Sequence, residues 1–367
     1  MSSAPAHRIL HLILLGSFVE GCLVCLFFLC YDPSAISILD PVNSPEQTEQ
    51  GKRVVPKKSN DVVPNSNDDV ITVLMWLWPF GVKHELNNCS CLFNIKGCFF
   101  TGDRNFYNQA DGVIFHHRDL DEDQFNLPKL NRPAFQKWIW MNMESPTNTP
   151  RIPTIENLFN LTVSYRQDST IPVPYGFIEA ADGKEEFVLP RKNKLVCWIV
   201  SNWKEELVRV KYFNELQKHI KVDTYGSAFG KYVPGVEYWS IITSCKFYLS
   251  FENSIHRDYI TEKFYNPLSV GTVPVVLGPP RHNYENVIQG DAFIHVDDFS
   301  SPKELADHLL LLDKNEEMYL RFFEWKRYFK ARRTMFVTEQ ICLTCDYLRR
   351  HKEYETLSNF KEWFWEN

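Results

Sequence analysis

The stretch KFYLSFENSIHRDYITEKFYNPLSVGTVPVVLGPP, residues 246–280, decides the fold. It opens with an apolar run of strand length at 246–251, which ends in the polar residues 252–254. A helical pattern follows over 259–268, and a second apolar run occupies 273–277. A strand, a helix and another strand in this order predict a parallel α/β sheet, with a site where the strands end.

The same pattern extends in both directions and predicts two doubly wound domains that face each other across a cleft. Around the opening stretch, strands are expected at 195–200, 222–225 and 293–296, and helices at 208–219 and 302–312. Further upstream, a separate series of strands is expected at 70–78, 112–115, 138–142 and 161–165. No internal repeat relates the two series.

The N-terminal segment predicts attachment to a membrane. Residues 9–31 form a nearly continuous apolar run, long enough for a membrane-spanning helix. Because no cleavage site with small residues follows it, we interpret the run as a signal anchor. Basic residues before the run and an acidic one after it place residues 1–8 in the cytoplasm and the rest in the lumen. Residues 32–69 lack periodicity and are expected to form a luminal stem.

The cysteines fit an oxidising lumen, where disulfide bonds are favoured. Ten occur in the chain, and those that follow the expected span are Cys89, Cys91, Cys98, Cys197, Cys245, Cys342 and Cys345. Their odd number leaves one thiol over. The spacing Cys342-x-x-Cys345 also occurs in redox and zinc sites, but residues 89–98 lack the spacing of a second ligand pair. Disulfides from these two cysteines back to 89–98 are therefore favoured. Two sequons, at Asn88 and Asn160, predict N-linked glycans.

Composition and motifs argue against several function classes. The formal net charge of −6 argues against a nucleic-acid binder. The chain contains neither a GxGxxG loop nor a Walker loop, which argues against an ordinary dinucleotide or ATP site. Aromatic residues make up 14% of the chain, enough for a core and for surfaces that stack on sugars.

Two cations in the second domain are candidates for binding an anionic group. Lys263 lies early in the helix expected at 259–268, where unpaired backbone amides attract anions, and Asp258 or Thr261 is expected to cap that helix. Arg209 lies near the start of another expected helix. For Lys263 the alternative is a solvated helix face with a Glu–Lys neighbour pair, and for Arg209 it is a surface arginine.

In the first domain, Glu144 is the candidate acid. It follows an apolar strand, and a carboxylate in a partly desolvated cleft has a raised pKa and can act as a general base. The alternative is an exposed loop glutamate. A metal site is disfavoured, because His116 and His117 are adjacent on a strand and point to opposite faces. Asp119-Leu-Asp121 imitates a metal-binding motif, but it lies in an acidic run typical of a solvated loop.

Residues 251–266 and 273–279 resemble the α1,3-fucosyltransferase family, as do His116-His117-Arg118-Asp119 and residues 141–146. The resemblance runs from about residue 70 to the C-terminus. It implies two facing Rossmann-like domains of the GT-B type, in which 70–176 binds the acceptor and 177–333 binds GDP-fucose. Residues 334–367 would form a tail linked by disulfides to the first domain.

The resemblance also implies the roles of individual residues. Glu144 matches the catalytic base, and Glu262 the acid near the fucose ring. Residues that match donor-binding positions are Tyr175, Ser201, Asn202, Arg209, Tyr248, Asn253, Tyr259, Glu262 and Lys263. On the acceptor side, the matches are His117, Arg118 and Glu144. Family pairing would give the disulfides Cys89–Cys342, Cys98–Cys345 and Cys197–Cys245, with Cys91 left over.

The expected function is that of a Golgi, single-pass type II enzyme. It would move fucose from GDP-fucose to the 3-hydroxyl of N-acetylglucosamine in type 2 glycans with inversion, and would need no metal for the chemistry. Arg118 stands where members that also act on type 1 chains have tryptophan. Val82 replaces a polar acceptor contact found in the family, which leaves the details of acceptor binding open. Two alternatives remain: a metal-dependent glycosyltransferase that uses Asp119 and Asp121, and a membrane-anchored lectin without activity.

Overall fold

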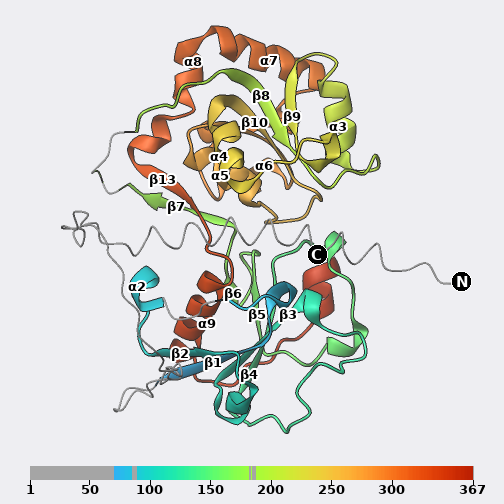
Figure 1. Cartoon of the computed structure of the whole chain (residues 1–367), viewed down its shortest axis with the longest axis vertical. Helices are drawn as coiled ribbons and strands as arrows, with labels where there is room; N and C mark the ends of the chain where they lie inside the picture. Colours follow the sequence, from blue (N-terminus) through green and yellow to red (C-terminus); the bar gives the residue numbers. More distant parts are fainter. Residues whose placement is uncertain (1–69, 85–88, 182, 184–186, 367) are drawn as a thin grey trace, which may run out of the picture. The chain divides into compact units, whose positions relative to one another are not determined.

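The computed structural model describes residues 70–84, 89–181, 183 and 187–366 (Figure 1). The predicted cytoplasmic tail, signal anchor and stem, and the sequon at Asn88, lie outside these residues. None of the described helices has the length and apolarity needed to cross a bilayer. Apart from residues 234–236, the described residues all belong to one compact unit.

The N-terminal half contains a parallel sheet with the strand order β2-β1-β3-β4-β5-β6. Its strands are β1 Ile71–Leu77, β2 Cys98–Thr101, β3 Gly112–His116, β4 Lys137–Asn142, β5 Leu161–Ser164 and β6 Ile171–Pro172. The four strands expected from the sequence are present, whereas β2 and β6 were not expected. The central strands are buried on both faces, which explains why they form continuous apolar runs.

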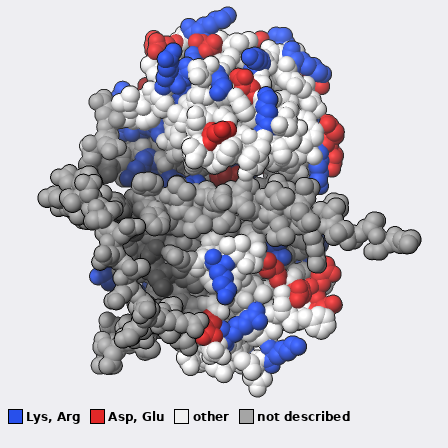
Figure 2. Space-filling model, in the orientation of Figure 1, with Lys and Arg blue, Asp and Glu red and all other residues white. Residues whose placement is uncertain are grey.

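A second parallel sheet, with the strand order β12-β11-β10-β8-β9, forms the C-terminal half. Its strands are β8 Lys194–Ile199, β9 Val222–Tyr225, β10 Cys245–Phe251, β11 Val273–Leu277 and β12 Ile294–His295. All of them were expected. The visible face of this half carries cationic and anionic side chains close together (Figure 2), in keeping with the small net charge of −6.

Helices cover both faces of the second sheet. They are α3 Val208–Leu216, α4 Gly235–Ser244, α5 Glu262–Ser269, α6 Arg281–Glu285, α7 Pro302–Lys314 and α8 Glu316–Arg321. Helices α3 and α7 share one core cluster with β8, β10 and β11, and α5 and α6 contribute to another. The helix expected at 259–268 begins only at Glu262, because Asp258 has a left-handed φ of 61° and Thr261 is the N-cap. The helix expected at 208–219 ends earlier, at Leu216.

The C-terminal residues return to the first sheet. Strand β13 (Phe329–Arg333) pairs antiparallel with β7 (Gly176–Ala180), and helix α9 (Thr338–Arg350) then packs against β1. Ile341 and Leu348 of α9 complete one core cluster of this sheet, while Phe360 and Phe364 complete the cluster around Trp140. The core of the N-terminal half is therefore built from both ends of the described chain.

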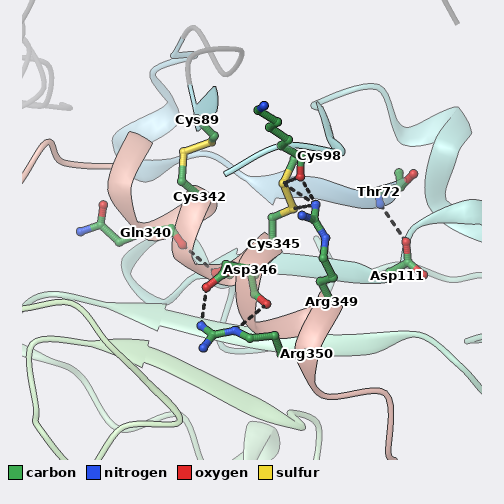
Figure 3. The surroundings of a disulfide bond; sticks show 12 residues. Thr72, Cys89, Cys98, Asp111, Gln340, Cys342, Cys345, Asp346, Arg349 and Arg350 are labelled. Carbon is green, nitrogen blue, oxygen red and sulfur yellow. Dashed lines mark hydrogen bonds and ion pairs between the residues drawn. A yellow bond between two sulfur atoms is a disulfide. The ribbon is translucent and has the colours of Figure 1, made fainter. Parts of the chain in front are cut away.

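Two disulfides fix α9 to the N-terminal half (Figure 3). They join Cys89 of the short helix α2 (Cys89–Phe93) to Cys342, and Cys98 at the start of β2 to Cys345. A third disulfide, Cys197–Cys245, connects β8 to β10. These are the pairs that the family resemblance implies, and Cys91 takes no part in a disulfide.

Candidate active site

The candidate site begins where β8 and β10 end. These neighbouring strands are parallel, so Ser201 and Asn202 after β8 lie at the same edge of the sheet as Glu252 and Asn253 after β10. Helices α3 and α5 start close to these segments in sequence. The hydroxyl of Thr261 caps α5 by accepting a hydrogen bond from the amide of Lys263 at 3.4 Å.

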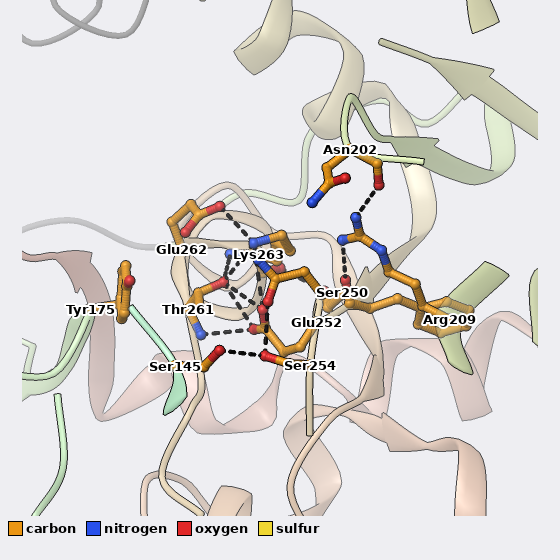
Figure 4. A network of polar contacts seen from close by, with 12 residues as sticks. Ser145, Tyr175, Asn202, Arg209, Ser250, Glu252, Ser254, Thr261, Glu262 and Lys263 are labelled. Carbon is orange, nitrogen blue, oxygen red and sulfur yellow. Dashed lines mark hydrogen bonds and ion pairs between the residues drawn. The ribbon is translucent and has the colours of Figure 1, made fainter. Parts of the chain in front are cut away.

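Glu252, which the sequence analysis did not select, is the buried centre of this edge (Figure 4). Glu252 is 2% exposed. Its Oε1 accepts hydrogen bonds from the Thr261 amide at 2.8 Å and from the Thr261 hydroxyl at 2.9 Å. Its Oε2 lies 3.4 Å from the Lys263 ammonium. Burial raises the pKa of Glu252, and the Lys263 charge opposes that rise. Glu252 therefore holds both the cap of α5 and the candidate phosphate-binding cation.

Lys263 is tied to the site by three neighbours. Besides Glu252, its Nζ lies 2.9 Å from the Thr261 hydroxyl and 3.0 Å from Oε1 of Glu262. Burial lowers the pKa of Lys263, but the two carboxylates outweigh burial, so its pKa lies above the usual value. The ammonium stays charged, and 21% of the side chain is exposed. The Glu–Lys neighbour pair of the alternative is present, but Lys263 is also bound to the buried Glu252 and is not a solvated surface lysine.

Arg209 is a buried cation, 3% exposed, and the alternative of a surface arginine is wrong as well. Its guanidinium donates to the carbonyl oxygens of Asn202 and, at 3.5 Å, of Phe251. The two bonds join the ends of β8 and β10. Its Nε has no hydrogen-bond partner within the described part of the chain. Burial lowers the pKa of Arg209, which remains a fixed positive charge at the sheet edge.

Glu144 follows β4 and is partly buried, rather than fully exposed as the alternative required. The carboxamide of Asn142 binds both main-chain polar groups of Glu144. Its Oδ1 accepts a hydrogen bond from the Glu144 amide at 3.2 Å, and its Nδ2 donates one to the Glu144 carbonyl at 3.3 Å. No hydrogen bond or ion pair holds its carboxylate among the residues that the structure describes. Burial raises the pKa of Glu144, while the charges of Arg118 and Lys263 oppose the rise. Such a carboxylate is suited to accept a proton.

The loop that carries Glu144 meets the loop that leads to Lys263. The hydroxyl oxygens of Ser145 and Ser254 lie 2.6 Å apart (Figure 4). Tyr175 donates its hydroxyl to the carbonyl of Met143, and the ring of Tyr259 lies edge-on to that of Tyr175 at 6.1 Å between centroids. The structure therefore brings the candidate base and the candidate cation of the two series together.

The remaining candidate donor residues differ in availability. Ser201 and Asn202 are exposed and Asn253 is half-buried, so all three can reach a ligand. Tyr248 lies within β10, is 1% exposed and packs with the disulfide cysteines of β8 and β10. Tyr259 is likewise buried, with 2% exposed, and the donor-binding roles of both tyrosines stay predictions.

On the acceptor side, Arg118 is exposed and lies over the ring of Phe80 at 5.3 Å, whereas His117 is buried. The Nδ1 of His117 accepts from the Trp140 indole at 2.9 Å, and its Nε2 lies 2.9 Å from the carbonyl of Pro150. Burial lowers the pKa of His117 to about 4, so the ring is neutral and Nε2 donates. Both ring nitrogens have partners within the protein, and the expected contact of His117 with the acceptor stays a prediction.

Two other predicted residues have structural partners. The carboxylate of Asp119 lies 2.6 Å from Nδ1 of His116 and accepts from the Phe80 amide at 2.9 Å. Within the described ranges, no group of three or more histidine, cysteine or carboxylate side chains is arranged so that it could hold a metal ion. Asn160, the second sequon, is 3% exposed, and its carboxamide bonds to Trp138 and Glu355. Its glycosylation stays a prediction.

Two family models match the chain. The model described as "Fucosyltransferase, N-terminal" matches residues 68–176, and "Glycosyltransferase family 10 (fucosyltransferase) C-term" matches residues 189–363. The 4-galactosyl-N-acetylglucosaminide 3-alpha-L-fucosyltransferase 9 of Rattus norvegicus is 48% identical over 363 residues, 99% of each chain. The 3-galactosyl-N-acetylglucosaminide 4-alpha-L-fucosyltransferase FUT3 of Pan troglodytes is 43% identical over 300 residues, 80% of each chain.

A solved structure has a similar fold. It is an alpha1,3-fucosyltransferase crystallised with GDP-fucose, and it is similar with a TM-score of 0.50 at 15% identity, over 81% of this chain and 96% of that one. This similarity and the two parallel sheets fit an α/β fold of the GT-B type.

Proposed function

The chain belongs to the fucosyltransferases of glycosyltransferase family 10, and from this membership we propose that it transfers L-fucose from GDP-β-L-fucose to the 3-hydroxyl of N-acetylglucosamine in type 2 N-acetyllactosamine glycans. The acceptors are glycans of glycoproteins and glycolipids, and the product is the Lewis X linkage. The observation that carries the proposal is the position of Glu144, a carboxylate with a raised pKa, on a loop bonded to the one that leads to Lys263.

The proposed reaction is a single displacement with inversion. Glu144 takes the proton of the acceptor hydroxyl, whose oxygen forms a bond to the anomeric carbon of fucose. The bond from that carbon to the diphosphate breaks, and GDP leaves with the electron pair. The β linkage of the donor becomes the α linkage of the product. Glu262 lies beside Lys263 and is placed to stabilise the positive charge that develops on the sugar.

The cations at the sheet edge support departure of the nucleotide. Arg209 and Lys263 are fixed positive charges, and preorganised charges stabilise a leaving anion without reorganisation at the moment of reaction. In the structure, Glu252 and Glu262 pair with Lys263. We expect the diphosphate to compete with Glu262, because Glu252 is buried and keeps its bonds to Thr261. The proposed chemistry thus needs only groups of the protein.

We further propose that the enzyme is a single-pass type II protein of the Golgi membrane with a luminal catalytic part. The apolar run at 9–31 and the charge bias around it support this proposal. Disulfides are typical of secretory compartments, and three are present in the described residues.

The test is a transfer assay with the full-length protein in detergent. GDP-fucose is offered with type 1 and type 2 disaccharides, with and without EDTA, and the linkage of the product is determined. We expect α1,3 product from the type 2 acceptor and resistance to EDTA. Loss of activity in EDTA would favour the metal-dependent alternative, and sugar binding without release of GDP would favour the lectin.

Replacement of Glu144 tests the role of the base. We expect Glu144→Gln to lower kcat by about 10²–10⁴-fold with an unchanged melting temperature. In the wild type, burial raises the pKa of Glu144, and the base must be deprotonated to act. The value of kcat/KM should therefore rise with pH through a pKa above that of an ordinary glutamate. Full turnover by the variant would remove Glu144 from this role.

A further inference from the structure

We propose that Ser254 is a positioning residue for Glu144 and acts through Ser145, an inference that rests on the proposed function. The Oγ atoms of the two serines lie 2.6 Å apart (Figure 4). Ser145 is 0% exposed and directly follows Glu144 in the chain. The hydrogen bond therefore ties the loop of the base to the loop that leads to α5.

The position of the base depends on its main chain, because no hydrogen bond or ion pair holds the Glu144 carboxylate within the described residues. Within the described residues, only main-chain bonds fix Glu144, and both of them come from Asn142 on the N-terminal side. On the C-terminal side, the Ser145 carbonyl accepts from the Thr149 hydroxyl at 2.8 Å, which closes the loop on itself. Two side-chain hydrogen bonds relate this closed loop to the donor side, and the bond from the Ser254 hydroxyl to Ser145 is the one next to the base.

Ser254 is well placed to relay the position of the donor loop. Its hydroxyl also lies 3.0 Å from Oδ1 of Asn253, a candidate donor contact. Two residues earlier, Glu252 is bonded to Thr261 and Lys263. The loop between the strand end and the cap of α5 is thus held at both its ends. A base on a loosened loop would spend less time at the distance and angle that proton transfer needs.

The chain offers a matched control in the same two loops. The hydroxyl of Thr147 lies 2.6 Å from Nε2 of His256, so this pair has the same length as the serine pair. Thr147 is exposed and stands three residues beyond the base. Water can replace this bond, and we expect its loss to leave Glu144 in place.

The experiment compares Ser145→Ala, Ser254→Ala, their double variant and Thr147→Val in the full-length protein. We expect each serine variant to lower kcat roughly 3–10-fold, the effect of one lost hydrogen bond. The dissociation constant of GDP-fucose should stay within about twofold, because the cations are unchanged. The double variant should be no slower than the slower single variant. Thr147→Val should keep wild-type kcat.

Three results would overturn the inference: kcat of Ser254→Ala equal to wild type, a loss confined to donor affinity, or effects of the two serines that multiply. Hydrogen–deuterium exchange of residues 143–149 gives a readout that does not need turnover. It should become faster in Ser254→Ala and stay unchanged in Thr147→Val. If the wild type transfers no fucose, the proposed function fails, whereas the exchange result still decides whether the tie exists.

Discussion

Replacing Lys263 by methionine should destabilise the protein in a way that reports on Glu252. Methionine keeps the apolar stem of the side chain but removes the ammonium 3.4 Å from the buried carboxylate. Breaking a buried ion pair by removing one partner costs about 3–5 kcal/mol, because the other charge stays buried without compensation. Lys263 is 21% exposed, so water already weakens the pair. We therefore expect a loss near the lower limit, about 3 kcal/mol.

A second substitution tests whether the lost stability comes from the unpaired charge of the buried Glu252 carboxylate. Glu252→Gln removes the negative charge but keeps an oxygen that can accept from the amide of Thr261. The double variant Lys263→Met/Glu252→Gln should regain most of the lost stability. It should not regain activity, because the proposed contact to the diphosphate is still missing. Glu252→Gln alone serves as the control for the effect of the amide.

The loss should also depend on pH, with a sign that follows from linkage. Burial raises the pKa of Glu252 in the folded protein, and removal of Lys263 raises it further. An acid whose pKa is higher in the folded state costs no stability below its unfolded pKa, and its cost grows as pH rises from there to the folded pKa. The deficit of Lys263→Met is thus absent below the unfolded carboxyl pKa, about 4.3, and grows as pH rises through the folded pKa. It should be smaller at pH 5 than at pH 8.

Thermal unfolding of the full-length protein in detergent measures these effects. A loss of about 3 kcal/mol corresponds to a decrease in Tm of roughly 6–12 °C. A decrease under about 2 °C for Lys263→Met would refute the reasoning. So would a double variant that is no more stable than the single one, or a deficit that does not change between pH 5 and pH 8.

Other parts of the structure yield predictions that the same measurement checks. Gly226→Ala should lower the stability by about 1–3 kcal/mol, because φ is 98° at this residue and the new Cβ would lie 2.2 Å from a main-chain oxygen. Gly230→Ala should lower it less, because φ is 64° there and no atom lies near the new Cβ. Phe364→Ala should cost about 3–5 kcal/mol, since this residue is 0% exposed. Replacing both cysteines of Cys197–Cys245 by alanine should cost about 4 kcal/mol, from a sequence separation of 48. Unchanged melting of any of these variants except Gly230→Ala would contradict its prediction.

Local sequence predicted most strands that form apolar runs, and also the half-buried strand β9, but it missed β2, β6, β7 and β13. β10 and β11 are apolar runs with polar ends, so their type could be predicted. β6 has only two residues, and β13 has the sequence FKARR, which pairs with β7 far away in the chain. Neither has a period that a short window could detect.

The site was predictable in part for a similar reason. Lys263 follows a capping residue, and Glu144 follows an apolar strand, so both could be selected from local sequence. Glu252 also follows an apolar strand and was not selected, and only the folded position of Thr261 and Lys263 explains its burial. The burial of His117 could not be predicted, because Trp140 and Pro150, which occupy its ring nitrogens, come from distant segments.

The return of α9 to β1 has a consequence for biosynthesis. The disulfides Cys89–Cys342 and Cys98–Cys345 span 253 and 247 residues, whereas Cys197–Cys245 spans 48. The ribosome must therefore synthesise the chain through Phe364 before the first sheet can complete its hydrophobic core and form its two disulfides. The C-terminal half can form its disulfide Cys197–Cys245 and fold before the N-terminal sheet is complete. Chaperones would therefore have to shield the strands of the N-terminal sheet for most of translation.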